Sequence, residues 1–323
     1  MSVDTFFVDD GAGWKLSLTR RSPPEGTPLA NAKPVLIVPG YGMNSFIFDF
    51  HPRGLSLKAY LASRGLETWS VDLRAQGKSI RGKDASDRYG IGDLAIDDVG
   101  AAIARVLKET RTGRTELDLI GASLGAALSF AHVACDPRAK IATMVTMAGL
   151  VTWVRPHPML RAAFFSRRVV RRIKVQNTRK IVGRALPLLV RFAPRLLGVY
   201  LNADSTDLSQ AETMLETVED PNSHVNAEIA EWIARRELVV RGVNVSRALG
   251  RMNHPYLCVV AQHDGVVPPH TARAIYDQIG STDKELLIIG ASHMKIAHAD
   301  LFLSTGAQDA VFAKIADFLL KRA

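Results

Sequence analysis

Short apolar runs that alternate with helix-like segments constrain this 323-residue chain more than any other sequence feature. Val35–Val38 is apolar throughout and lies between Pro34 and Pro39, which is the pattern of a strand buried on both faces. Leu55–Arg64 follows with helical spacing and stops at Gly65. Strands that alternate with helices predict an α/β fold, with a mostly parallel central sheet and helices on both of its faces. We expect further strands at residues 5–8, 14–20, 67–71, 117–120, 141–147, 256–261 and 284–289, and further helices at 91–109, 124–134, 271–279 and 307–321.

The alternation stops after Leu150 and resumes at Tyr256. Residues 151–250 have a mostly helical and irregular pattern, without the apolar runs of buried strands. An insertion between two strands explains this order better than an independent domain does. We therefore expect a core formed by residues 1–150 and 251–323, with residues 151–250 as a helical cap or lid.

The positive charge of the chain is concentrated in one segment. The net charge is +9, yet Arg155–Arg195 alone holds twelve Lys and Arg residues and no acidic residue, so the rest of the chain is slightly acidic. The next stretch, Asp204–Glu237, holds nine acidic residues. One interpretation is a basic helical face that is solvated or paired with the acidic stretch. The other is attraction to an anionic partner such as a membrane surface, because apolar residues interleave with the arginines as in interfacial helices.

Several classes of protein are excluded by what the sequence lacks. Its two cysteines, Cys135 and Cys258, are too few for a disulfide scaffold or a cysteine-rich metal site, and we expect neither a metal nor a cofactor. No RNA- or DNA-binding motif accompanies the basic segment, so nucleic acid is not the expected partner. The first residues lack the pattern of a signal peptide, and no apolar run reaches the roughly 18 residues of a membrane span. We expect a cytoplasmic protein, with peripheral membrane association as the alternative.

The strongest chemical signal is a serine between two glycines. Gly121-Ala122-Ser123-Leu124-Gly125 follows an apolar strand and precedes a helix of small residues. A serine on such a tight strand-to-helix turn projects its hydroxyl at the carboxyl edge of the sheet, where the N-terminus of the helix faces the reacting centre. We interpret Ser123 as a nucleophile rather than as part of a purely structural turn.

A nucleophilic serine needs a base, and the base needs a carboxylate that orients it. Asp264 follows the expected strand 256–261, and His293 follows the expected strand 284–289, which gives the order serine, acid, histidine. We assign Asp264 as the acid and His293 as the base, and we expect His298 to be structural. Asp72 also ends a strand, but it is a weaker candidate for the acid.

Two backbone N–H groups are candidates for an oxyanion hole. Gly40-Tyr41-Gly42 directly follows the strand 35–38, and Leu124 follows the nucleophile. The N–H groups of Tyr41 and Leu124 are expected to converge on a carbonyl oxygen, where each donor typically contributes about 3 kcal/mol of transition-state stabilisation. The alternative is a glycine turn that only ends the strand.

Together these segments resemble the α/β-hydrolases. The matching blocks lie in both parts of the expected core and not in the insertion; they are Val38–Gly42, Val71–Ser79, Gly121–Gly125, His263–Pro268 and Gly290–Met294. The resemblance implies the α/β-hydrolase fold, a Ser123–His293–Asp264 triad and Tyr41 with Leu124 as oxyanion donors. One departure is Pro39, where many relatives have His, although backbone donors do not need that imidazole. The oxyanion loop is also similar to that of polyhydroxyalkanoate synthases, in which the nucleophile is Cys; the serine here favours hydrolysis.

The expected function is that of a serine hydrolase acting on small-molecule carboxylic esters, an esterase or lipase. The large insertion with its many apolar residues favours apolar acyl groups. One alternative is an acyltransferase or thioesterase that uses the same triad. Another is a binding protein without catalysis, which docks an anionic membrane or nucleic acid through Arg155–Arg195.

Overall fold

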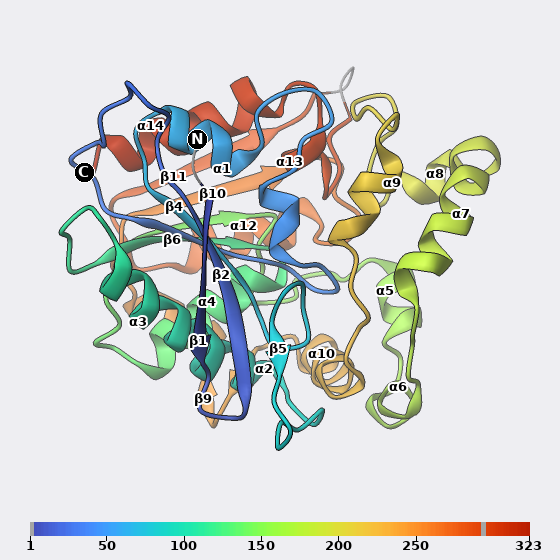
Figure 1. The fold of residues 1–323 in the computed structure, drawn as a ribbon. Helices are drawn as coiled ribbons and strands as arrows, with labels where there is room; N and C mark the ends of the chain where they lie inside the picture. The colour runs from blue at the N-terminus through green and yellow to red at the C-terminus, as the bar shows by residue number, and fades with distance from the viewer. Residues whose placement is uncertain (1–2, 292–294) are drawn as a thin grey trace.

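The computed structural model describes residues 3–291 and 295–323, and a twisted, mostly parallel sheet forms its centre (Figure 1). Eight strands follow the order β1-β2-β4-β3-β6-β7-β10-β11, with a short β5 paired to β2. The pairs from β4 to β11 are parallel, whereas β1, β2 and β5 pair in antiparallel fashion. The strands are β1 Val3–Asp9, β2 Trp14–Arg21, β3 Val35–Val38, β4 Thr68–Asp72, β5 Ile80–Arg81, β6 Leu117–Ala122, β7 Ile141–Met147, β10 Tyr256–Ala261 and β11 Lys284–Ile289.

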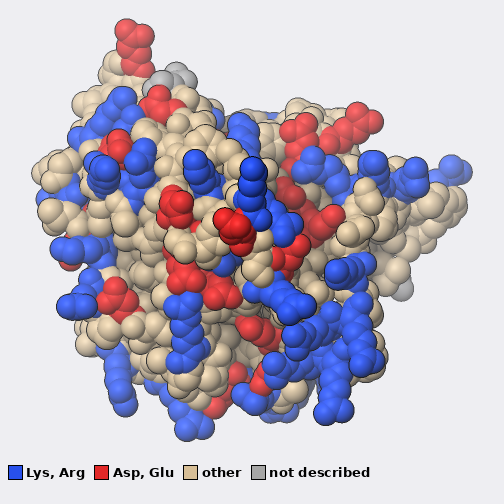
Figure 2. All heavy atoms as spheres, turned by 60° about the horizontal axis from the view of Figure 1, so that its bottom comes forward, with Lys and Arg blue, Asp and Glu red and all other residues tan. Residues whose placement is uncertain are grey.

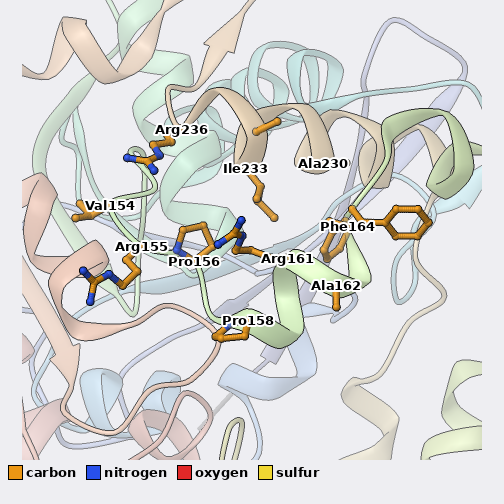
Figure 3. Close-up of a pocket in the computed structure, with 12 residues that line it drawn as sticks. Val154, Arg155, Pro156, Pro158, Arg161, Ala162, Phe164, Ala230, Ile233 and Arg236 are labelled. Atoms are coloured by element: carbon orange, nitrogen blue, oxygen red, sulfur yellow. The ribbon is translucent and has the colours of Figure 1, made fainter.

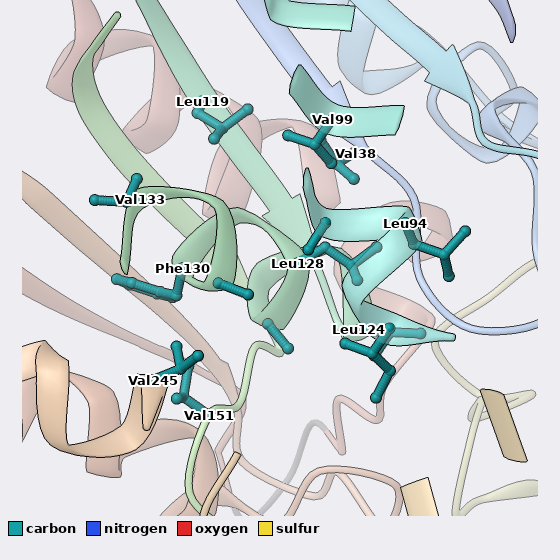
Figure 4. Packing of buried hydrophobic residues seen from close by; sticks show 14 of the residues in the cluster. Val38, Leu94, Val99, Leu119, Leu124, Leu128, Phe130, Val133, Val151 and Val245 are labelled. Atoms are coloured by element: carbon teal, nitrogen blue, oxygen red, sulfur yellow. The ribbon is translucent and has the colours of Figure 1, made fainter. Parts of the chain in front are cut away.

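Helices cover both faces of the sheet and enclose two hydrophobic cores. The side chains of β3 alternate between these cores: Leu36 and Val38 belong to one, and Val35 and Ile37 belong to the other. The first core is covered by α3 Val99–Glu109, α4 Leu124–Cys135 and α12 Pro269–Gln278, and Figure 4 shows part of its packing. The second is covered by α1 Leu57–Ser63, α13 Asp300–Leu303 and α14 Ala313–Leu320. The expected α/β architecture is therefore confirmed.

The parallel register brings several strand ends to one edge of the sheet. Val38 of β3 pairs with Gly121 of β6, and Ala261 of β10 pairs with Ile289 of β11. Because parallel strands end on the same side, the loops that follow these strands meet at the carboxyl edge. Tyr41, Ser123 and Asp264 follow β3, β6 and β10 at this edge, and Leu124 is the first residue of the helix after β6.

Two of the expected long helices contain a wider turn. The segment 91–109 consists of α2 Ile91–Asp93, a π-helical turn η2 Leu94–Asp98, and α3. Asp98 is the last residue of the π turn and is fully buried. Its carboxylate forms an ion pair with the Arg74 guanidinium at 2.5 Å. The extra residue of a π turn changes the direction of the following side chain, which is consistent with this buried contact. The closing segment likewise begins with the π-helical turn η5 Gln308–Phe312 before α14.

Short strands also lie outside the expected set. β8 Val239–Val240 and β9 Val243–Asn244 form a hairpin whose turn residues, Arg241 and Gly242, both have positive φ. Such a turn matches the twist of a two-stranded hairpin. Strands of two residues carry no apolar periodicity, so the sequence pattern does not indicate them.

The insertion between β7 and β10 consists of two parts that differ in packing. Its second part joins the first core, to which α10 contributes Trp232 and η4 contributes Leu249. We call its first part, Pro158–Leu197, the arm. Within the arm, α6 packs against α10, whereas α7 and α8 project from the body of the molecule (Figure 1). The insertion contains α5 Pro158–Ala163, α6 Arg167–Arg172, α7 Thr178–Phe192, α8 Pro194–Leu197, α9 Ala211–Met214, η3 Leu215–Thr217, α10 Ser223–Arg235, the β8–β9 hairpin, α11 Val245–Ala248 and η4 Leu249–Arg251.

Among the described residues, no helix combines the length and the apolar character needed to cross a bilayer.

Candidate active site

Ser123 occupies a strained turn between β6 and α4. Its φ is 52° and its ψ is −118°, a backbone conformation that residues with a side chain rarely adopt. The turn is held because the Ser123 N–H donates to the carbonyl of Met147 at 2.9 Å and the Ser123 carbonyl accepts from Ala126 at 3.0 Å. The strand-to-helix context expected from the sequence is therefore present. Ser123 Oγ makes no hydrogen bond to any residue that the structure describes.

The glycines on either side of Ser123 are required by close packing. A Cβ atom on Gly121 would lie 2.5 Å from the Cα atom of Ala126, and one on Gly125 would collide with the carbonyl oxygen of Val38. Gly40, at the end of β3, lies equally close to the turn, because its Cβ would be 3.0 Å from that of Ser123. The glycine pattern therefore lets the nucleophile turn approach the loop after β3.

Asp264 is paired with His298. The Oδ2 atom of Asp264 lies 2.7 Å from the Nδ1 atom of His298, and both side chains are buried. The other carboxylate oxygen accepts the backbone N–H groups of Val266 and Val267, each at 2.8 Å. These bonds fix the carboxylate in one orientation, and the pair leaves Nε2 as the ring nitrogen of His298 that is not engaged by Asp264.

His298 therefore has the contact that the sequence analysis assigned to His293. His293 lies outside the described residues, so its assignment as base stays a prediction. The sequence favoured His293 because it follows the expected strand 284–289 directly, within the block Gly290–Met294 that resembles the family. One sequence signal could have indicated the later histidine, because His298 is followed by Asp300 and an apolar helical turn. In the structure, residues 300–303 are buried and fix this part of the loop.

Asp300 anchors the loop that carries His298. Its fully buried carboxylate accepts the N–H of Ala297 at 2.7 Å, the N–H of Asn202 at 3.1 Å and the hydroxyl of Thr206 at 2.8 Å. Burial raises the pKa of this carboxyl, and the hydrogen bonds oppose that shift. Asp300 thus joins the histidine loop to the chain that returns from the arm.

The loop after β3 presents the two candidate oxyanion donors. Among the described residues, neither the Tyr41 N–H nor the Leu124 N–H has a backbone or side-chain acceptor. The Tyr41 hydroxyl instead donates to Asn226 on α10, and burial raises its pKa well above the usual range. Free N–H groups beside a nucleophile have the chemistry that an oxyanion hole needs. Their assignment to that role stays a prediction.

The insertion supports the same loop through backbone contacts. The N–H of Glu219 donates to Gly42 at 2.9 Å, and Asn44 donates to Thr217 at 2.9 Å. Met43 and Val218 form an isolated antiparallel bridge between these bonds. Residues 42–44 are therefore bound to residues 217–219 of the insertion as well as to the sheet.

Three residues of the insertion contact the three loops of the site. Phe164 packs edge-on against the ring of Tyr41, with 6.3 Å between the ring centroids. The Val199 carbonyl accepts the N–H of Gly265, next to Asp264, at 3.0 Å. The ring of Tyr200 lies 5.8 Å from that of His298. The insertion thus contacts the Tyr41, Asp264 and His298 loops, two of them through aromatic rings.

Asp72, the weaker candidate for the acid, and His270, a further histidine after β10, have other contacts. Asp72 accepts the backbone N–H groups of Ser45 and Lys78, at 2.8 and 2.9 Å, so its carboxylate stabilises loops. His270 lies in the first turn of α12 and its Nε2 atom faces the carbonyl of Arg155 at 3.1 Å. Neither residue contacts Ser123 or Asp264 through any described hydrogen bond.

A cavity of about 770 Å³ lies between the start of the arm and α10 (Figure 3). Three arginines line it, Arg155, Arg161 and Arg236, and no acidic side chain of the described chain forms an ion pair with them. Phe164 belongs to both the cavity wall and the Tyr41 contact. Phe164 therefore joins the cavity wall to the ring of Tyr41.

Comparison with known proteins places the chain in a family. Residues 31–296 match the model of a family described as serine aminopeptidase, S33. Among functionally curated proteins, no sequence match is found.

Solved structures with similar folds include three hydrolases. A soluble variant of monoglyceride lipase from Saccharomyces cerevisiae superposes with a TM-score of 0.67 at 16% identity, over 100% of this chain and 96% of that one. An esterase from Thermogutta terrifontis gives 0.63 at 18% identity, over 99% of both chains. An esterase from Exiguobacterium antarcticum gives 0.61 at 17% identity, over 98% and 99%. At such identities the likeness shows the fold. Because the family match covers most of its length, the chain belongs to the S33 serine aminopeptidase family and is an α/β-hydrolase of esterase- and lipase-like structure.

Proposed function

We propose that this hydrolase cleaves carboxylic esters, as an esterase or lipase, through an acyl-enzyme on Ser123. The observation that carries the proposal is the buried contact of 2.7 Å between Asp264 and His298, at the sheet edge where the strained Ser123 turn lies. A carboxylate that holds Nδ1 of an imidazole leaves Nε2 to act as a base toward a serine hydroxyl. The esterases and lipases of similar fold support the same reaction class.

In this proposal the base is His298. As Ser123 Oγ attacks the ester carbonyl, Nε2 of His298 takes the hydroxyl proton, and the carbonyl π electrons move onto the oxygen. Asp264 stabilises the imidazolium through Nδ1–H. The structure shows no hydrogen bond between Ser123 and His298, and such bonds are often long until substrate binds.

The tetrahedral intermediate then collapses to an acyl-enzyme. Its negative oxygen accepts the N–H groups of Tyr41 and Leu124, which have no other acceptor among the described residues. The bond to the alcohol breaks, and the alcohol leaves with the proton from His298. A water molecule repeats the sequence, with His298 as base, and releases the carboxylic acid and free Ser123.

Apolar acyl groups fit the surroundings of the nucleophile. The rings of Phe164 and Tyr200 lie against those of Tyr41 and His298, respectively, and the Val199 side chain lies next to Gly265. Burial of an apolar chain against such side chains contributes about 25 cal/mol for each Å² removed from water. We therefore propose an ester with an apolar acyl chain as the substrate.

The test compares the two histidines of one loop. We expect His298→Ala to lower kcat for p-nitrophenyl esters by about 10⁴-fold, as does Ser123→Ala, because either change removes a member of the triad. His293→Ala is the matched control and is expected to keep most of the activity. Circular dichroism spectra and thermal unfolding establish that all three variants fold. A fall with His293→Ala and retained turnover with His298→Ala would overturn the assignment of the base.

The choice of substrate in the same assay separates the reaction classes. A series of esters with increasing chain length gives a maximum at short chains for an esterase and at long chains for a lipase. An amino-acyl p-nitroanilide tests the peptidase activity in the family's description. Competing alcohols and an acyl thioester test acyl transfer and thioester cleavage. Preferred turnover of any of these last three substrates contradicts ester hydrolysis as the main activity.

A further inference from the structure

We propose that the arm, Pro158–Leu197, is a docking surface for anionic lipid bilayers, with its apolar side chains among the lipids and its cations at the phosphates. The inference concerns a surface outside the Ser123 site and does not depend on the proposed ester hydrolysis. It rests on the charge of the arm, on its exposed apolar side chains and on the arrangement of apolar and basic side chains in two lines along α7.

The cations of the arm are largely without acidic partners. From Arg155 to Arg195 the chain has twelve Lys and Arg residues and no Asp or Glu. Within the described part, only Arg167 and Arg179 form ion pairs, with Glu231 at 2.6 Å and Glu219 at 3.8 Å. The acidic stretch after the arm therefore neutralises little of its charge. The arm cations whose exposed side chains have no described acidic partner are Arg161, Arg168, Arg171, Arg172, Lys174, Lys180, Arg184 and Arg191.

Large apolar side chains are exposed on the same segment. Soluble domains expose such residues singly, whereas a group of them on one surface marks an interaction site. Few arm side chains are buried, chiefly Val170, Leu186 and Leu197. The exposed ones, with their exposed fractions, are Met159 48%, Phe165 68%, Val169 39%, Ile173 50%, Ile181 55%, Leu188 60%, Phe192 69% and Leu196 53%.

Helix α7 orders these side chains into an apolar line beside a basic one. Ile181, Leu188 and Phe192 are spaced so that, at about 100° per residue, they lie within about 20° of one line along the helix. Arg184 and Arg191 lie roughly 60–80° to one side of it, whereas Leu186 points the opposite way and is buried. An apolar line flanked by cations is the pattern of a helix that lies in the membrane interface.

The same features disfavour other occupants. A second copy of the chain would bring one basic arm against another, without the acidic residues that would offset the repulsion. Nucleic acid would pair with the arginines but would leave Leu188 and Phe192 in contact with water or phosphate. An anionic bilayer is complementary to both kinds of side chain at once.

The position of the arm makes this surface accessible. The arm extends from the body of the molecule, and Figure 2 shows Lys and Arg gathered along this projection and below it, with acidic side chains closer to the centre. At its base lies the cavity lined by Arg155, Arg161 and Arg236. Phe164, at the end of α5, connects this region to Tyr41 of the site.

The test measures binding of the full chain to vesicles of phosphatidylcholine, with or without phosphatidylserine, by flotation. All proteins carry Ser123→Ala, so the result is independent of any lipid turnover. We expect binding to the vesicles with phosphatidylserine, little binding to phosphatidylcholine alone, and a decrease with added salt. The triple variant Arg168→Glu, Arg171→Glu, Arg172→Glu is expected to bind at least about tenfold more weakly.

Matched controls separate the arm from net charge and from general hydrophobicity. Lys108→Glu, Arg138→Glu, Lys140→Glu changes the net charge by the same amount on exposed residues outside the arm, and it is expected to bind like the parent. Leu188→Asp on α7 is paired with Ile80→Asp on β5, which is 51% exposed, and only the first is expected to weaken binding.

Equal losses in the arm and control triples would overturn the proposal, as would equal binding to both vesicle types. Tighter binding to duplex DNA than to vesicles would assign the arm to nucleic acid. If the protein does not bind vesicles but self-associates, and Leu188→Asp abolishes the self-association, the arm would be an interface with a second copy of the chain. Because esterase activity is absent from every protein tested, none of these outcomes depends on the reaction at Ser123.

Discussion

At the scale of single residues, Ser123 shows a conflict between stability and chemistry. Its positive φ places a side chain where the backbone favours glycine, and its Cβ lies close to Gly40. Such strain costs on the order of 1–3 kcal/mol and persists when the surrounding structure enforces it. Here the buried strand β6, helix α4 and the hydrogen bond to Met147 enforce it.

Glycine at this position is expected to stabilise the fold. We predict that Ser123→Gly raises the free energy of unfolding by about 1 kcal/mol, because glycine adopts this conformation without strain. Urea denaturation measures the change. Ser123→Ala is the control, since it removes the same hydroxyl but keeps the Cβ atom. Equal stabilities of the two variants would show that the turn is not strained by its side chain.

The site residues were predictable from the sequence to different degrees. The position of Ser123 was predictable, because the strand before it, the two flanking glycines and the helix of small residues after it specify the turn locally. Asp264 follows β10 and its carboxylate pairs with a histidine that lies after β11, whereas its role as the acid stays a prediction. The contact between Asp264 and His298 was not predictable, since it depends on how Asp300 and Asn202 fold a long loop. That contact joins distant parts of the chain, which periodicity does not report.

At the scale of elements, strand β6 contains a buried carboxyl group remote from the Ser123 turn. Asp118 lies near the first residues of β6, whereas Ser123 follows its last, and Asp118 is almost fully buried. Burial raises its pKa to about 7, opposed by a hydrogen bond to Thr143 and by the charge of Lys33. The folded protein therefore binds this proton more tightly than the unfolded chain does.

This shift has a consequence for stability. As pH rises from about 4 to about 7, the unfolded chain loses the proton first, so the free energy of unfolding decreases. We predict that Asp118→Asn, which stays neutral, is more stable than the wild type at pH 8 by roughly 2–4 kcal/mol, and that the two differ much less at pH 4. Chemical denaturation at several pH values measures the difference. A constant difference across this range would contradict the raised pKa.

The strands and most helices of the core were predictable within a few residues. Continuous apolar runs such as Val35–Val38 and Ile141–Met147 become strands because both faces of the sheet are covered. The π turns were not predictable, since η2 depends on the contact between Asp98 and Arg74, which are far apart in sequence. The β8–β9 hairpin was too short to produce a pattern.

At the scale of the whole molecule, the arm and the body differ in how much apolar surface they bury. The two cores contain most buried side chains, whereas the arm contributes few. Segments with few buried contacts open at a lower free energy than the global unfolding transition. The insertion is thus heterogeneous, with α10 to η4 belonging to the body.

Limited proteolysis is expected to distinguish these parts. Trypsin cleaves after Lys and Arg, and the exposed cations of the arm lie in the segment with the fewest buried contacts. We predict that the first cleavages occur between Arg167 and Arg184, while the buried Arg20 and Lys58 remain protected. Mass spectrometry of early fragments identifies the sites. First cleavage within residues 3–150 or 251–291 would contradict a weakly packed arm.

The bridge between Met43 and Val218 also bears on how such enzymes are recombined. Residues 217–219 bind the backbone of the loop after β3, so the inserted sequence supplies part of the scaffold of the candidate site. A chimera that takes only the arm from a homologue would keep the contact between residues 42–44 and 217–219. A chimera that replaces the whole insertion would also replace residues 217–219 and would therefore disturb turnover and selectivity together. A chimera that keeps the native residues 217–219 avoids this loss.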